Sequence, residues 1–92
     1  MRIEVIASGS TGNCYWVSDG HTHLLLDCGI PRAKIAAFLH ERHLPGIDAV
    51  LCSHGHLDHS KAVKELLRMG VDVYMSTGTE KALGVDGQVK TL

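Results

Sequence analysis

The chain has 92 residues, of which 45% are hydrophobic and 21% are charged, so it should form one small domain with an aliphatic core and marginal stability without a metal or a partner. Its formal net charge of −1 shows no broad basic excess of the kind that signals nucleic-acid binding, although neutrality does not exclude a local patch. Three cysteines without paired spacing argue against a disulfide framework, and without a secretory leader or a membrane-length apolar run they indicate reduced thiols in a cytoplasmic protein.

The first third of the sequence predicts β-strands. Arg2 to Ala7 alternates polar and apolar residues as a half-buried strand does. Ser8 to Asn13 is rich in glycine and hydroxyl groups, but it lacks the lysine of a nucleotide-binding loop and precedes a strand, so we expect a loop at the rim of a site. Cys14 to Val17 and Thr22 to Asp27 should pair as a hairpin, because Ser18-Asp19-Gly20 between them contains an Asp-Gly pair.

Helix and strand signals alternate through the middle of the chain. Pro31 suits the first turn of a helix that continues to about Arg42 and ends near His43. Ala49 to Cys52 is a short apolar run typical of a buried strand. Lys61 to Met69 carries apolar residues at helical spacing, followed by a glycine where a helix would stop.

The last third continues the alternation. Val71 to Met75 predicts a strand, and Ser76 to Glu80 contains a capping box for a short helix that ends near Gly84. The tail from Val85 to Leu92 is interpreted as one more strand. This order predicts an α/β fold, with a mixed sheet and helices on one of its faces.

The segment from Ser53 to Ser60, called the metal loop below, holds three imidazoles and one carboxylate within six residues. Imidazole nitrogen and carboxylate oxygen are ligands for Zn²⁺, and ligands so close in sequence converge only where the backbone is not a regular helix. Gly55 would free the backbone between the first two ligands. We predict that one metal ion binds to His54 and His56, and a second ion to Asp58 and His59.

Asp27 ends a predicted strand after three leucines, where a carboxylate needs a partner to offset its desolvation. The second ring nitrogen of a metal-binding histidine would be such a partner. The other four histidines lie before the metal loop, and nothing in their spacing makes them ligands. His21 and His23 are expected in a surface turn, and His40 and His43 at the polar end of a helix.

These residues resemble a known family. The His-x-His-x-Asp-His pattern after a buried strand is similar to the signature of the metallo-β-lactamase superfamily of metal-dependent hydrolases. Ser8 to Tyr15 and Leu24 to Ile30 are similar to the opening of its YycJ/WalJ-like branch, whose members are phosphodiesterase-type nucleases acting on DNA. The resemblance implies half of an αββα sandwich, with residues 1–92 as the N-terminal portion of the fold.

By this resemblance, Asp27 supports the metal loop without binding metal, and Asp58 belongs to a two-zinc catalytic centre that activates water; Mn²⁺ is an alternative metal. The family pattern continues with further ligands, whereas this sequence has no histidine after His59. Two functions stay open: a phosphodiesterase or nuclease, and a non-catalytic metal-binding or assembly module. The expected partners are nucleic acid or another phosphodiester, and either a second copy of the chain or a complementary C-terminal half that covers the bare face of the sheet.

Overall fold

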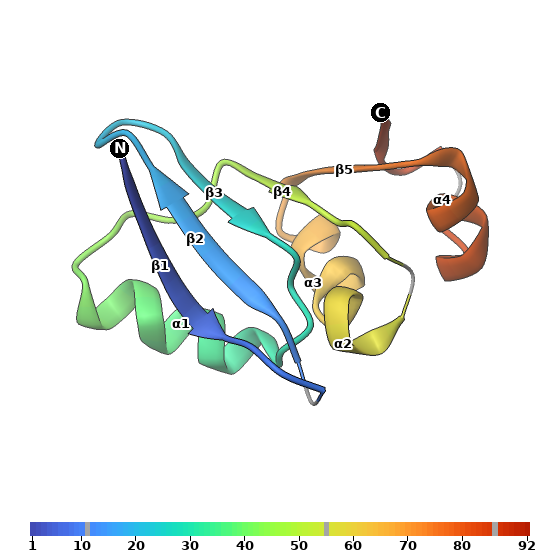
Figure 1. The fold of residues 1–92 in the computed structure, drawn as a ribbon. Helices are drawn as coiled ribbons and strands as arrows, with labels where there is room; N and C mark the ends of the chain where they lie inside the picture. Colours follow the sequence, from blue (N-terminus) through green and yellow to red (C-terminus); the bar gives the residue numbers. More distant parts are fainter. Residues whose placement is uncertain (11, 55, 86) are drawn as a thin grey trace.

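Within the described residues, a six-stranded mixed sheet forms the framework of the chain (Figure 1). The structure, a computed structural model, describes residues 1–10, 12–54, 56–85 and 87–92, without the side chains of Leu57 and Asp58. The strands lie side by side in chain order: β1 (Arg2–Ala7), β2 (Cys14–Ser18), β3 (His23–Leu26), β4 (Ala49–Leu51), β5 (Asp72–Met75) and β6 (Lys90–Thr91). The first three strands are antiparallel, and β3 to β6 are parallel. The predicted mixed sheet is therefore confirmed.

The helices of the described residues are α1 (Arg32–Glu41), α2 (Leu57–Ser60), α3 (Val63–Arg68) and α4 (Thr77–Leu83). Three of them, α1, α3 and α4, begin and end close to the predicted positions, whereas α2 lies where a loop was expected. Pro31 precedes α1, and the chain leaves that helix through His43, whose positive φ of 55° is typical of a helix end. No helix among the described residues has the length and apolar character needed to cross a membrane.

One face of the sheet carries the core. Figure 1 shows α1, α2 and α3 on the same side of the strands. Alternate residues of β2 to β5 point to that side and are buried, as the period of a strand requires. The buried positions on this face are Cys14, Trp16, Leu25, Val50, Val73 and Met75. Ile35 and Phe38 from α1 and Val63 and Leu66 from α3 pack into the same cluster.

The opposite side of the sheet, called the open face below, is largely apolar. Its residues form two rows across the strands, because the pairing registers bring them opposite one another. The rows are Ile3, Val17, Leu24, Ala49 and Asp72, and Val5, Tyr15, Leu26, Leu51, Tyr74 and Lys90, so the face is apolar from β1 to β4 and charged residues enter at β5 and β6. On this side Ile3 is 65% exposed and Val5 is 60% exposed.

Three expectations from the sequence need correction. Asp58 and His59 were expected in a non-helical loop, but they lie in the short helix α2. The turn closes because His59 N–H donates to the carbonyl of His56 at 2.9 Å and the Ser60 hydroxyl donates to the same carbonyl at 2.8 Å. His23, expected at the surface, is only 7% exposed, because it belongs to β3 and stacks on Trp16 at a ring distance of 5.8 Å.

The third correction concerns the predicted capping box. The Ser76 hydroxyl caps α4 by accepting the Thr79 N–H at 3.3 Å. Glu80, expected to reach back to the start of the helix, is buried and accepts the Thr91 hydroxyl at 2.8 Å. The reason is β6, which places the Thr91 hydroxyl within hydrogen-bond distance of the Glu80 carboxylate. The predicted strand in the tail is thus Lys90–Thr91, and Asp86 lies outside the described residues.

Candidate metal centre

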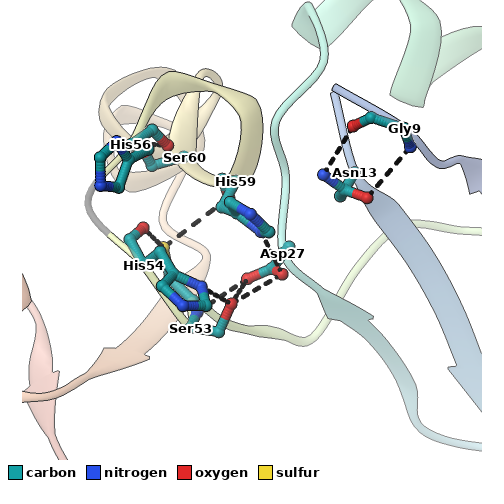
Figure 2. Close-up of polar contacts among 9 residues, drawn as sticks. Gly9, Asn13, Asp27, Ser53, His54, His56, His59 and Ser60 are labelled. Carbon is teal, nitrogen blue, oxygen red and sulfur yellow. Dashed lines mark hydrogen bonds and ion pairs between the residues drawn. The ribbon is translucent and has the colours of Figure 1, made fainter. Parts of the chain in front are cut away.

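Asp27 is the residue around which the candidate site is built. It follows β3 directly, and its backbone has a φ of 63°. Few residues other than glycine adopt this left-handed region, and those that do cluster at functional sites. The Asp27 N–H donates to the carbonyl of Leu51 at 2.8 Å, which ties the turn to the end of β4. In this conformation the carboxylate points toward the metal loop (Figure 2).

The metal loop occupies both carboxylate oxygens of Asp27. Oδ1 accepts the backbone N–H of Ser53 at 2.7 Å and the Ser53 hydroxyl at 2.8 Å. Oδ2 lies 2.8 Å from that hydroxyl and 2.8 Å from Nδ1 of His59. The Asp27 side chain is only 11% exposed, so water screens these bonds little. The contact with a histidine of the metal loop is the kind that the sequence suggested, while the role of Asp27 toward a metal stays a prediction.

Ser53 is a residue of the candidate site to which the sequence analysis gave no role. Its hydroxyl contacts Asp27 and also lies 2.8 Å from Nδ1 of His54. An ionised carboxylate only accepts hydrogen bonds, so the hydroxyl donates to Asp27 and its oxygen accepts Nδ1–H of His54. One serine oxygen thereby links two side chains that do not touch each other. The signal in the sequence was its position, directly before the first histidine and across the sheet from the end of β3.

Hydrogen bonding fixes the tautomer of two predicted ligands in the same way. Nδ1 of His59 donates directly to Asp27, and Nδ1 of His54 donates to Ser53. In the neutral form of each ring the proton then lies on Nδ1 and Nε2 is bare, which is the form of imidazole that binds a metal. The two rings are adjacent, with centroids 4.6 Å apart.

The other two predicted ligands are not brought into this pair. Figure 2 shows His56 beside Ser60, turned away from His54 and His59. The side chain of Asp58 lies outside the described residues, as does Gly55. Within the described part of the chain, no three His, Cys, Asp or Glu side chains stand close enough to hold a metal ion. The proposed ligand set of His54, His56, Asp58 and His59 therefore stays a prediction.

A buried thiol lies under the metal loop. Sγ of Cys52 is 3.1 Å from the carbonyl oxygen of His54 and 3.7 Å from that of His59. Burial, and after it the charge of Asp27, raises the pKa of the Cys52 thiol to about 11, so at neutral pH the thiol keeps its proton and donates it. Cys14 and Cys28 are also buried and free, as the sequence predicted. Cys52 thus contacts the backbone carbonyls of both histidines whose rings are adjacent.

The glycine-rich loop after β1 reaches the same region from the other side. Asn13 and Gly9 close it through two hydrogen bonds, at 3.0 and 3.3 Å (Figure 2). The carbonyl of Asn13 accepts the N–H of Gly29 at 2.9 Å, and the neighbouring Cys28 N–H donates to the carbonyl of His59 at 2.8 Å. Two hydrogen bonds therefore connect this loop to α2. Thr11 lies outside the described residues.

Because Gly12 has no side chain, the glycine-rich loop can approach the backbone of Gly29 closely. A Cβ at this position would lie 2.5 Å from the carbonyl oxygen of Gly29, which is backbone and cannot rotate away. We expect Gly12→Ala to lower the free energy of unfolding by about 1–3 kcal/mol, the usual cost of overpacking, in chemical denaturation. The matched control is Gly78→Ala in α4, where a Cβ meets no atom within 4 Å. That variant should be neutral or more stable by up to about 1 kcal/mol, and equal effects of the two would contradict this account.

The donors present suit a divalent transition metal. Two imidazoles with bare Nε2 atoms, each fixed through Nδ1, are the arrangement in which histidine binds zinc. They stand beside the loop between β4 and α2, at the carboxyl ends of parallel strands, where ligands of open α/β sheets bind.

Comparison with known proteins agrees with this geometry. "Exodeoxyribonuclease WalJ" of Streptococcus pneumoniae is 35% identical over 86 residues, which are 90% of this chain and 32% of that protein. "Exodeoxyribonuclease YycJ" of Bacillus anthracis is 34% identical over 86 residues, which are 90% of this chain and 33% of that protein. The chain spans about a third of the length of these curated relatives.

Solved structures and a family model complete the comparison. The crystal structure of the BLEG-1 B3 metallo-beta-lactamase matches with a TM-score of 0.72 at 24% identity, over 87% of this chain and 39% of that one, and this likeness concerns the fold alone. The fold is therefore that of half an αββα sandwich. The model of the metallo-beta-lactamase superfamily matches residues 7–86. The chain belongs to the metallo-β-lactamase superfamily.

Proposed function

We propose that the chain provides the first part of a metal-dependent hydrolase that cleaves phosphodiester bonds in nucleic acid. The observation that carries the proposal is the link from one carboxylate to two imidazoles: Asp27 contacts His59 directly and His54 through Ser53. These hydrogen bonds hold the imidazoles of His54 and His59 in place before a metal ion binds. A bound Zn²⁺ or Mn²⁺ would supply Lewis-acid chemistry, by activating water and by offsetting charge on phosphoryl oxygens.

The residues of the chain have separate tasks in this proposal. His54 and His56 belong to one ion, Asp58 and His59 to the other, and Asp58 is assigned to the catalytic centre. Asp27 keeps the Nδ1 protons in place, and buried Cys52 braces the backbone beneath the rings. The choice of nucleic acid as substrate is supported by the names of the two relatives, both exodeoxyribonucleases. The three free thiols support a reducing compartment such as the cytoplasm.

Metal analysis tests the proposal directly. After reconstitution with Zn²⁺, we expect stoichiometric metal in the purified chain and an affinity lower by more than about 100-fold in His54→Ala and His59→Ala. His40→Ala is the control, since His40 is exposed at the end of α1 and should leave the affinity unchanged. Chain without stoichiometric metal, or equal affinity in all three variants, would overturn the metal site.

Activity separates the proposed enzyme from the alternative, a non-catalytic metal-binding or assembly module. Bis(p-nitrophenyl) phosphate is a suitable chromogenic substrate because its hydrolysis needs no nucleic-acid contact. We expect slow turnover that requires metal and disappears in His54→Ala. Metal binding without any turnover would favour the module, for which the separate orientation of His56 already gives some support.

The open face adds a proposed partner. Apolar residues of five strands face this side, and Ile3, Val5 and Leu26 among them are exposed large hydrophobics, as at a surface that another layer covers. We propose that a second layer packs on it, supplied either by a complementary C-terminal half or by a second copy of the chain.

A further inference from the structure

A groove separate from the metal loop lies between α3 and the segment that follows α4. Its volume is about 510 Å³, which is within the range of small-ligand sites. The lining residues are Lys64, Leu67, Arg68, Gly84, Val85 and Gln88. Three of them are exposed and polar, while Val85 is buried and Leu67 is partly buried. The groove thus combines an apolar floor with a polar rim that carries two positive charges.

The charges at the rim are not neutralised by the described part of the chain. The other three arginines each lie within 3.7 Å of a glutamate: Arg2 and Arg42 with Glu4, and Arg32 with Glu65. Arg68 has no such ion pair among the described residues, and neither has Lys64. Both side chains come from α3, where their four-residue spacing places them on one face of the helix, about one turn apart. Two cations on the same side of a groove favour an anionic ligand.

We propose that this groove binds one strand of the nucleic-acid substrate, with Lys64 and Arg68 on successive phosphates and the partly buried Leu67 against a sugar or base. This inference rests on the proposed function and extends it to a substrate contact outside the metal loop. Phosphate contacts of this type hold the strand in register without reading its sequence. The amide of Gln88 can donate to a phosphate or to a base edge.

The position of the groove along the chain suits this role. α3 begins four residues after His59, and Lys64 is the fifth residue after His59, which limits the distance between the Cα atoms of His59 and Lys64 to about 18 Å. Lys61, exposed between α2 and α3, adds a third cation between the metal loop and the groove. The distance between His59 and Lys64 is short enough for a strand of a few nucleotides to reach from the metal loop to the positive side of α3.

Binding of a labelled oligothymidylate of about ten nucleotides, followed by fluorescence anisotropy over a range of salt concentrations, tests the groove. Each cation that contacts a phosphate contributes about 0.7 to the slope of log K against log salt for a single strand. We expect Lys64→Gln and Arg68→Gln each to weaken binding about fivefold at ~0.1 M salt and to reduce the slope by ~0.7. The control is Lys34→Gln on α1, an exposed lysine outside the groove, which should bind like the parent chain.

Two further measurements keep this test distinct from that of the metal site. Zinc titration of the Lys64 and Arg68 variants should give the parent affinity, since neither residue contacts the metal loop in the described structure. Unchanged affinity and salt slope in both variants would overturn the groove as a nucleic-acid contact, even if the chain binds zinc and hydrolyses the chromogenic diester. A chain that binds the oligonucleotide through Lys64 and Arg68 but binds no zinc would instead contradict the proposed hydrolase and leave the groove standing.

Discussion

Replacing Asp27 by alanine is expected to lower the zinc affinity of the chain about 10- to 100-fold and to destabilise the fold. The loss of affinity follows because Nδ1 of His59 and the Ser53 hydroxyl lose the acceptor that fixes both imidazoles. The loss of stability follows because the Ser53 N–H also loses its acceptor, and one such part-buried hydrogen bond contributes about 0.5–1.5 kcal/mol. Isothermal titration with zinc and thermal unfolding would measure the two effects separately.

The variant Asp27→Asn removes the negative charge at this position but allows the same backbone conformation, so the two contributions can be measured separately. Asparagine tolerates the left-handed backbone at Asp27 and keeps one acceptor oxygen, so most of the stability should remain while the affinity for metal decreases. Asp48→Asn is the matched control. Asp48 also accepts a backbone N–H, that of His23 at 2.7 Å, but it precedes β4 and lies at the opposite end of the strand from the metal loop. If Asp27→Ala bound zinc as tightly as Asp48→Asn, Asp27 would have no part in the metal site.

A lysine in the middle of the open face is expected to prevent the packing of the proposed second layer. In Leu26→Lys the charge would stand between Tyr15 and Leu51, the neighbours of Leu26 on the adjacent strands. Covering it would bury an unpaired ammonium group and forfeit the ~1.5–3 kcal/mol that a buried leucine contributes. Together these costs should weaken association at least 100-fold, which corresponds to about 2.7 kcal/mol. Sedimentation velocity over a range of concentrations would measure the change.

The same sedimentation experiment distinguishes between the two candidate partners for the open face, a second copy of the chain and a complementary C-terminal half. A parent chain that sediments as a dimer, with Leu26→Lys a monomer, indicates a second copy, whereas a parent monomer that binds a hydrophobic dye indicates that a complementary half is missing. Ala37→Lys places the same charge on exposed α1, away from the open face, and should behave as the parent chain does. A stable parent monomer without any dye-accessible apolar surface would contradict both forms of the proposal.

The sequence was sufficient for those parts of the fold that depend on local patterns. Alternation in β1, the Asp-Gly pair before β3 and the proline before α1 each act within a few residues, so the elements appear where they were predicted. His23 was misjudged because its burial comes from stacking on Trp16, which belongs to another strand. Glu80 was misjudged for a similar reason, since its partner Thr91 joins it only through pairing of β5 with β6.

The candidate site, too, could be predicted only in the parts that depend on local sequence. Its place between β4 and the following helix could be predicted, because three histidines after a short apolar strand are rare without a function. The link through Ser53 could not, because it requires the left-handed turn at Asp27 and the register of β3 against β4. The helical conformation of α2 was also missed, since the hydroxyl of Ser60 that closes the turn is indistinguishable in sequence from a solvated one.

The strand order has a consequence for how the chain folds. Every strand pairs with the one that precedes it, so each new strand can add to an edge that already exists. The antiparallel pairs of β1 to β3 are local in sequence, whereas each parallel pair from β3 onward requires a longer loop to close, so the meander is expected to form first. The order also applies during synthesis, when the N-terminal part emerges first. The β1–β3 meander and Asp27 are synthesised before β4, and pairing of β4 with β3 both fixes the Asp27 turn through Leu51 and brings Ser53 and the imidazoles to the Asp27 carboxylate.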